Sequence, residues 1–197
     1  MYNTFLGTRD TVTKPTDFNA NDRIDVGLLN AHTHFLTGEI TEDNINSCIK
    51  WIVYENLTKS SQKELTLYIN STGGDLYQAF GLIDIMRGSN YPITTIGIGS
   101  IMSAAFLIFV SGTKGSRYIA PNTGIMCHQF SEGMDAKYHD IKAQMKESEY
   151  CNVRMTNILK EASGLPLSKI KAKLLPASDV YLTAQEMVDL GLADSVL

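Results

Sequence analysis

The stretch from Gly88 to Thr113 contains no charged residue and is long enough to be tested as a transmembrane helix. Its first half is rich in β-branched residues and is interrupted by Pro92, Gly97 and Gly99, while the apolar run that follows, residues 104–110, is short. These interruptions favour two separate elements over one long helix. We therefore expect a buried strand, then a buried helix, and no membrane partner.

The order of strand and then helix occurs twice. Strands are expected over residues 65–69 and 94–98, each followed by a helix, over residues 76–87 and 103–111. Another helix should begin after Thr41, which can cap it. Apolar strands that alternate with helices predict an α/β fold, in which helices cover a parallel sheet. Right-handed crossovers bring the carboxyl ends of both strands to one edge of the sheet, where a site is expected.

Length and charge restrict the function classes. A chain of 197 residues, 44% of them hydrophobic, suits one domain with a sizeable core. A net charge of −4 argues against a nucleic-acid partner, because phosphate binding needs clustered lysine and arginine. Residues 1–22 are polar and lack the pattern of a signal peptide. We expect a flexible arm or a trimmed leader there, and a single domain over residues 23–197.

The cysteines and histidines do not form a metal-binding pattern. The three cysteines are scattered and have no metal-ligand spacing, so we expect free thiols, a reducing compartment such as the cytoplasm, and no metal. His32 and His34 alternate on a predicted strand. Two histidines alone make a poor metal site, and we expect structural roles for both.

Three residues in separate segments supply the side chains of a serine hydrolase: Ser103, His128 and Asp179. A serine hydroxyl is a weak nucleophile at neutral pH, so it needs an imidazole to accept its proton and a carboxylate to orient that imidazole. Ser100 is a competing nucleophile, and either serine could simply cap the helix that follows. Cys127 beside His128 offers a thiol alternative, although adjacent residues on a strand point to opposite faces. By itself, the aspartate could equally be an ordinary loop residue.

The predicted turn before Ser103 differs from the G-x-S-x-G elbow of the α/β-hydrolases. Its glycine, Gly99, lies four residues before the serine, and no glycine follows two residues after it. A serine at the start of a helix still lies beside backbone N–H groups and the positive end of the helix dipole, which suits a tetrahedral oxyanion. Gly73 and Gly74 could direct N–H groups toward a substrate, but two glycines are also typical of a simple tight turn.

Several segments in register resemble the ClpP family, the proteolytic subunits of the ATP-dependent Clp protease, over about residues 23–197. The matching segments are Phe35–Gly38, Leu67–Gly74, Gly99–Arg117, Met126–Gln129, Asp179–Ala184 and Gly191–Leu197. The resemblance implies a ClpP/crotonase-type fold of repeated ββα units with a projecting handle helix. Residues 135–162 offer such a helix independently, because they favour helix, carry many charges and are followed by Gly164 and Pro166.

The resemblance also implies a function: a serine endopeptidase that hydrolyses unfolded polypeptides to short peptides inside an oligomeric chamber. Ser103 would be the nucleophile, His128 the general base and acid, and Asp179 the orienting carboxylate. The backbone N–H groups of Gly74 and Ala104 would form the oxyanion hole. Family members are homo-oligomeric rings, usually two stacked heptamers, and an AAA+ unfoldase such as ClpX, ClpA or ClpC uses ATP to feed them. The chain itself should need no cofactor.

Four positions depart from the family's pattern. Thr72 replaces the proline usual before the two glycines and Ala104 the methionine usual after the nucleophile, but both keep their backbone donors, so activity should survive. Val180 replaces an arginine that helps the two rings communicate, which leaves double-ring assembly open. Gly88 falls where an aromatic residue often lines the pocket that docks the unfoldase. Tyr68, Tyr118 and Leu197 would still supply part of that pocket.

Two other functions stay open at this point. Some family paralogues are catalytically silent ring subunits that co-assemble with an active ClpP, but they typically lack a triad residue, and all three candidates are present here. A crotonase-like acyl-CoA enzyme would share the fold and a two-donor oxyanion hole. It would not need Ser103, His128 and Asp179 together.

Overall fold

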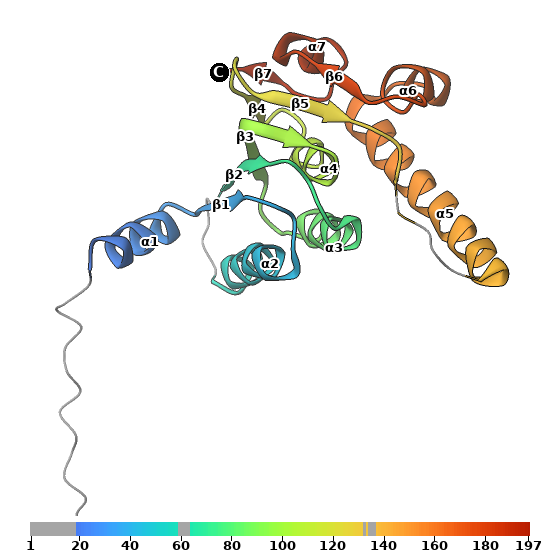
Figure 1. Cartoon of the computed structure of the whole chain (residues 1–197). Coiled ribbons are helices and arrows are strands. Elements are labelled where there is room, and N and C mark those ends of the chain that lie inside the picture. Colours follow the sequence, from blue (N-terminus) through green and yellow to red (C-terminus); the bar gives the residue numbers. More distant parts are fainter. Residues whose placement is uncertain (1–18, 59–63, 132, 134–136) are drawn as a thin grey trace, which may run out of the picture.

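The computed structural model describes residues 19–58, 64–131, 133 and 137–197. They form seven helices and seven strands (Figure 1). The strands are β1 (Thr33–Thr37), β2 (Leu65–Ser71), β3 (Ile93–Met102), β4 (Arg117–Ile119), β5 (Gly124–Cys127), β6 (Val180–Leu182) and β7 (Ser195–Val196). The helices are α1 (Ala20–Asn30), α2 (Glu42–Leu57), α3 (Leu76–Arg87), α4 (Ala104–Val110), α5 (Tyr138–Ser163), α6 (Leu167–Lys173) and α7 (Ala184–Asp189).

The strands form one sheet that is mostly parallel. Its main order is β1-β2-β3-β4-β7, and every neighbouring pair in this series is parallel. A branch leaves from β3, which pairs in parallel with β5, and β5 pairs in antiparallel with β6. The expected α/β fold with a parallel sheet is therefore confirmed, while the antiparallel strand β6 was not anticipated from the sequence.

Strand β3 is longer than the sequence indicated. The expected strand over residues 94–98 and the turn after it are in fact one strand, Ile93–Met102. The first half pairs with β4 (Thr95–Gly97) and the second half with β5 (Ser100–Met102). Because β5 supplies a partner for the second half, the glycines in β3 do not end the strand, and β3 delivers its last residues directly to the start of α4.

The helices pack in a row on one face of the sheet. Helices α2, α3, α4 and α5 contact one another in that order (Figure 1). All seven residues of α4 are buried, so the apolar run is a buried core helix as expected. In β2, buried residues alternate with less buried ones, so helices cover one face of this strand and leave the other face more open. No helix among the described residues is long and apolar enough to cross a membrane.

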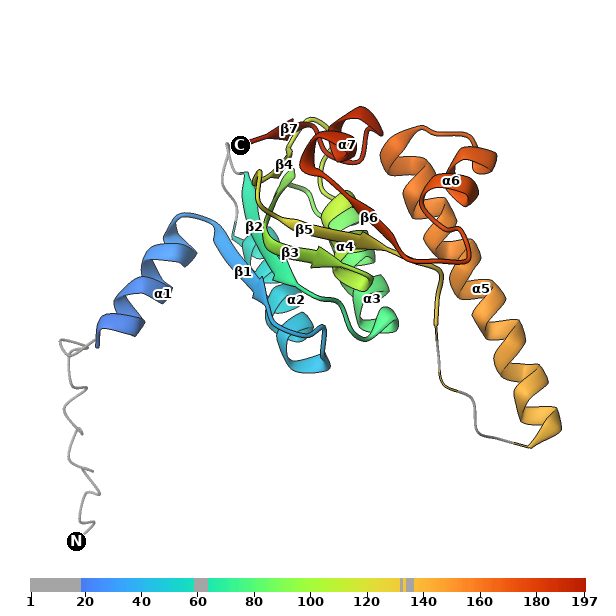
Figure 2. The same ribbon diagram turned by 45° about the horizontal axis from the view of Figure 1, so that its top comes forward.

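Helix α5 projects from the fold, and Figure 2 shows its N-terminal half extending away from the sheet. Its four buried residues, from Cys151 to Leu159, all lie in its second half. It ends at Gly164, whose positive φ of 73° is the left-handed conformation that commonly terminates helices. The expected handle helix is present over Tyr138–Ser163, and the first residues of the expected range, 135 and 136, lie outside the described residues.

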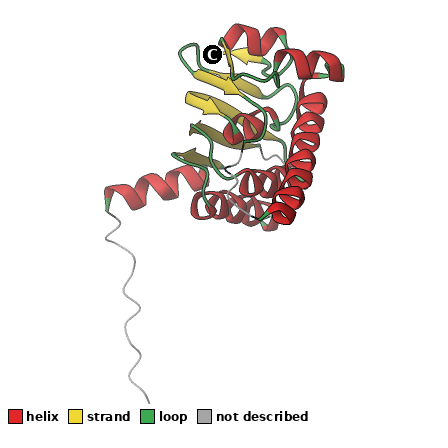
Figure 3. Ribbon diagram, turned by 45° about the vertical axis from the view of Figure 1, so that its right-hand side comes forward, coloured by secondary structure: helices red, strands yellow, loops and turns green. Residues whose placement is uncertain are grey.

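Helix α1 stands apart from the sheet in Figure 3 and has no buried residue. It begins at Ala20, where the side chain of Asn19 accepts a hydrogen bond from the N–H of Asp22 (3.0 Å). The arm expected over residues 1–22 therefore overlaps a helix at its end, and residues 1–18 lie outside the described residues.

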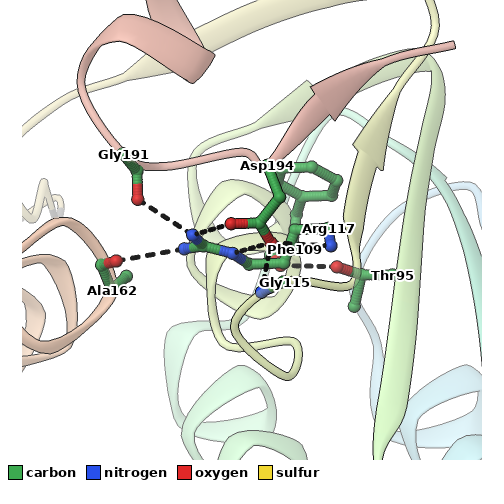
Figure 4. A network of polar contacts seen from close by, with 7 residues as sticks. All are labelled: Thr95, Phe109, Gly115, Arg117, Ala162, Gly191 and Asp194. Carbon is green, nitrogen blue, oxygen red and sulfur yellow. Dashed lines mark hydrogen bonds and ion pairs between the residues drawn. The ribbon is translucent and has the colours of Figure 1, made fainter.

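Arg117 of β4 joins three parts of the C-terminal half (Figure 4). Its side chain is 1% exposed and donates through Nε and Nη2 to both carboxylate oxygens of Asp194, at 2.9 and 2.8 Å. The same guanidinium also donates to the carbonyls of Ala162 (3.1 Å) and Gly191 (3.0 Å). The carboxylate in turn accepts the backbone N–H groups of Gly115 and Arg117. This network fixes the end of α5 and the approach to β7 against the sheet.

Candidate active site

Ser103 lies between β3 and α4 in a strained backbone conformation. Its φ of 53° and ψ of −122° fall outside the regions that non-glycine residues normally occupy. Such strain is typical of functional sites and is held in place by the surrounding structure. Here the N–H of Ser103 donates to the carbonyl of Met126 in β5 at 2.9 Å. Ser103 occupies the N-cap position of α4, but its side chain makes no capping hydrogen bond, which disfavours the alternative that it serves only as a cap.

His128 follows β5 directly and meets Ser103. Its Nε2 lies 2.7 Å from Ser103 Oγ, a short hydrogen bond between a hydroxyl and an imidazole. The parallel pairing of β3 with β5, ending at Met102 and Met126, brings the residues just beyond these two strands together. Ser100 instead contacts Asn70, with its Oγ 3.3 Å from Oδ1. Of the two candidate serines, Ser103 is therefore the one that contacts the histidine.

The thiol alternative is disfavoured by burial. Cys127 is 2% exposed, and this burial raises the pKa of its thiol to about 12, although a hydrogen bond with the backbone of His128 acts in the opposite direction. A thiol with such a pKa is protonated at neutral pH and is a poor nucleophile.

His128 and Asp179 each lie one residue beyond the paired ladder of β5 and β6. In the antiparallel ladder of β5 and β6, Ile125 pairs with Leu182 and Cys127 with Val180. The next pair in the same register would be His128 and Asp179, and residues directly opposite in such a ladder have Cβ atoms about 4.5–5.5 Å apart. Within the described residues no hydrogen bond or ion pair joins these two side chains, and Asp179 is exposed. The structure thus joins two of the three candidate residues and leaves the third disengaged.

The glycine turn passes close to the serine. Gly73 has a φ of 100°, and a Cβ at this position would lie 2.7 Å from Ser103 Cβ and 2.8 Å from the carbonyl oxygen of Met102. Any other residue would be strained and would also clash with the site. The backbone N–H groups of Gly74 and Ala104 donate to no acceptor among the described residues. The turn therefore does more than reverse the chain, because it borders the serine and keeps an amide group available there.

A cavity of about 390 Å³ opens at the serine–histidine pair. Besides Gly74, Ser103, Ala104 and His128, its walls include Leu76, Tyr77, Phe130 and Met155. The sequence did not identify these wall residues, since α3, the segment after β5 and α5 bring them together from distant parts of the chain. An apolar wall beside a polar pair can accommodate an apolar side chain of a ligand next to the hydroxyl.

The other histidines contact structural partners. His32 Nδ1 lies 3.1 Å from Oε2 of the buried Glu55, and His34 stacks on Trp51 with ring centroids 5.3 Å apart. Burial lowers the pKa of His34. No cluster of three or more histidine, cysteine, aspartate or glutamate side chains that could hold a metal occurs in the part of the chain that the structure describes.

Comparison with known protein families gives one match that covers nearly the whole chain. The model of the family described as Clp protease matches residues 18–197, which include the glycine turn, the serine, the histidine and the aspartate. This range agrees with the segments in which the sequence resembles ClpP. The chain belongs to the Clp protease family, and its fold is that of a ClpP family member.

Proposed function

We propose that this chain is a serine endopeptidase of the ClpP type, the proteolytic subunit of an ATP-dependent protease. The observation that carries the proposal is the 2.7 Å hydrogen bond between Ser103 Oγ and His128 Nε2, at a serine held in a strained conformation at the start of α4. A strained serine paired with an imidazole is the arrangement that makes a hydroxyl nucleophilic.

The reaction follows from these positions. His128 Nε2 takes the proton of Ser103 Oγ as the oxygen attacks the carbonyl carbon of the peptide bond. The oxyanion formed there is stabilised by the N–H groups of Gly74 and Ala104. His128 then gives its proton to the leaving amine, and water hydrolyses the acyl-serine through the same groups. Asp179, opposite the imidazole in the strand register, is the carboxylate that orients it during turnover.

The assembly is part of the proposal. We propose homo-oligomeric, heptameric rings that enclose the sites in the cytoplasm, and an AAA+ unfoldase such as ClpX, ClpA or ClpC that delivers unfolded protein. Tyr68 and Tyr118 align with Ile96 in one row across β2, β3 and β4, and Tyr68 stacks on the exposed ring of Phe35. Phe35 is exposed and both tyrosines are half-buried, and aromatic rings of this kind suit the docking of a partner's apolar segment.

A second candidate is a silent subunit that co-assembles with an active ClpP. The absence of a hydrogen bond from Asp179 to His128 within the described residues favours it, because an unoriented imidazole is a weaker base.

Hydrolysis of short fluorogenic peptides by the purified protein tests the two candidates. The protease proposal expects turnover that Ser103→Ala abolishes and Ser100→Ala leaves nearly unchanged. Full activity in Ser103→Ala would contradict the mechanism. An inactive wild-type chain that becomes incorporated into the rings of an active ClpP would favour the silent subunit.

A further inference from the structure

We propose that Gln129 is a positioning residue of this site. Its side-chain amide fixes the segment that carries His128 against the loop that leads to Asp179, and so holds the carboxylate close enough to the imidazole for the two to meet during turnover. The proposal rests on the serine-peptidase function proposed above. It adds a residue that takes no part in bond making or breaking and acts through the aspartate.

The contacts of Gln129 are specific. Its Nε2 donates to the carbonyl oxygens of Leu175 (2.9 Å) and Pro176 (3.1 Å). An amide nitrogen carries two hydrogens, so both can be used at once. Leu174 and Leu175 are buried in the core, at 0% and 5% exposure. The acceptors therefore lie on a loop with a fixed position, shortly before Asp179 in the chain.

The strand register explains why this link matters for Asp179. The paired residues of β5 and β6 end at Cys127 and Val180, one position short of His128 and Asp179. Beyond that point, within the described part of the chain, the side-chain hydrogen bonds between residues 128–131 and residues 174–179 are the two that Gln129 makes. The distance between the imidazole and the carboxylate thus depends on a contact made by the neighbour of His128.

The opposite side of the same segment is held by α5. The N–H of Phe130 donates to Oδ1 of Asn152 at 3.0 Å, and the Nδ2 of Asn152 donates to the carbonyl of Ser148 at 3.0 Å. The histidine segment is therefore tied to two different elements at successive residues. Asn152 fixes it to α5, and Gln129 fixes it to the loop of the aspartate.

Because Gln129 is exposed, an effect of this residue on catalysis can be distinguished from an effect on stability. The side chain of Gln129 is itself exposed and its bond to Pro176 lies at the surface, so its removal leaves the packed core intact; only the bond to Leu175 is partly buried. Gln129 also lines the cavity at the serine–histidine pair, so its removal could affect turnover through the substrate as well as through Asp179. An effect through the aspartate disappears when Asp179 is replaced, whereas the loss of a substrate contact persists.

The test is a double-mutant cycle on kcat with a short fluorogenic peptide, measured from pH 6 to 9. Gln129→Met keeps the length of the side chain and removes both donors. We expect kcat to fall about tenfold, the size of effect that two neutral hydrogen bonds can produce, with KM changed less than about twofold. In an Asp179→Asn background the same substitution should change kcat less than about twofold, because the partner through which Gln129 acts is already lost.

Two further variants keep the test decisive. Gln185→Met is the matched control, since Gln185 Nε2 donates to Asp189 Oδ1 at 2.8 Å on the surface of α7, and its kcat should equal that of the wild type. Gln129→Leu also removes both donors without adding a charge beside the imidazole, and it serves if the methionine variant fails to fold. A Gln129→Met chain as active as Gln185→Met, or equal losses in both backgrounds, would overturn the inference alone. A wild-type protein without peptidase activity and without a fluorophosphonate adduct on Ser103 would overturn the proposed function, and the inference with it.

Discussion

The substitution Arg117→Met should cost more stability than any surface substitution in this protein. The methionine keeps part of the apolar stem but removes all four hydrogen bonds of the guanidinium, two of them to Asp194. The carboxylate is left inside the fold with only its backbone donors, and the carbonyls of Ala162 and Gly191 lose their partner. An uncompensated charge of this kind is the main cost of breaking a buried ion pair.

The magnitude follows from burial. Removing one partner of a buried, hydrogen-bonded pair costs about 3–5 kcal/mol of the free energy of unfolding. The side chain of Asp194 is 19% exposed and keeps the N–H groups of Gly115 and Arg117, so we expect the lower end, about 3 kcal/mol. The matched control is Arg87→Met, whose ion pair with Glu161 has side chains 42% and 64% exposed. Exposed pairs of this kind contribute about 0–1 kcal/mol.

Urea unfolding measures both variants. Trp51 is the single tryptophan and is 6% exposed, so its fluorescence reports the loss of the core around α2. The protomer concentration has to be equal in all samples, because assembly shifts apparent stability. If Arg117→Met lost no more stability than Arg87→Met, the buried network would not hold the C-terminal half as described.

Three further outcomes are expected. Burial alone would raise the pKa of Asp194, but hydrogen bonds from the neighbouring arginine outweigh it and hold the pKa below its usual range. The wild type should therefore have a larger free energy of unfolding than Asp194→Asn above about pH 4, and this difference should disappear as the pH falls further. A difference that does not change with pH would argue against this. Gly73→Ala should lower peptidase activity at least tenfold through its clash with Ser103, while Gly27→Ala, where a Cβ meets nothing within 4 Å, should be neutral; equal activities would refute the steric argument. Finally, Cys127 should resist iodoacetamide at pH 8 until the protein unfolds, and rapid labelling of the folded protein would contradict its raised pKa.

Elements with local signals could be predicted closely from the sequence. Helix α3 runs over the expected residues, Leu76–Arg87, because its apolar residues recur at helical spacing and Asp75 caps its start by accepting from two backbone N–H groups. The last helix begins after Thr183, where the sequence from Thr183 to Glu186 has the pattern of a capping box and the two residues exchange hydrogen bonds. Both signals lie within a few residues of the boundary that they set.

Features that depend on a distant partner could not be predicted in this way. The second half of β3 reads as a glycine-rich turn, and it is a strand because β5 pairs with it. Strand β6 is too short to give a pattern of its own and exists through its antiparallel pairing with β5. Glycines lower the strand propensity of a segment, but hydrogen bonding to a neighbouring strand can still make that segment a strand.

Some features of the candidate site could also be predicted from the sequence, and others could not. The sequence offered Ser103 as the nucleophile with Ser100 as a competitor, and contact with His128 distinguishes the two serines in the structure. The disengaged position of Asp179 and the contribution of Met155 to the cavity depend on how β6 and α5 are placed. Neither has a local signal. Gln129 lies in a segment that matches the family, but its hydrogen bonds to residues 175 and 176 depend on the fold that places that loop beside it.

The most direct test of a working serine–histidine pair is the reaction of the native protein with a fluorophosphonate, followed by mapping of the adduct by mass spectrometry. The account predicts an adduct on Ser103 alone, absent from heat-denatured protein and from Ser103→Ala, because only a serine activated by His128 beside the oxyanion donors reacts with this reagent. An unlabelled native protein, or equal labelling after heating, would contradict the claim that this pair is assembled for catalysis.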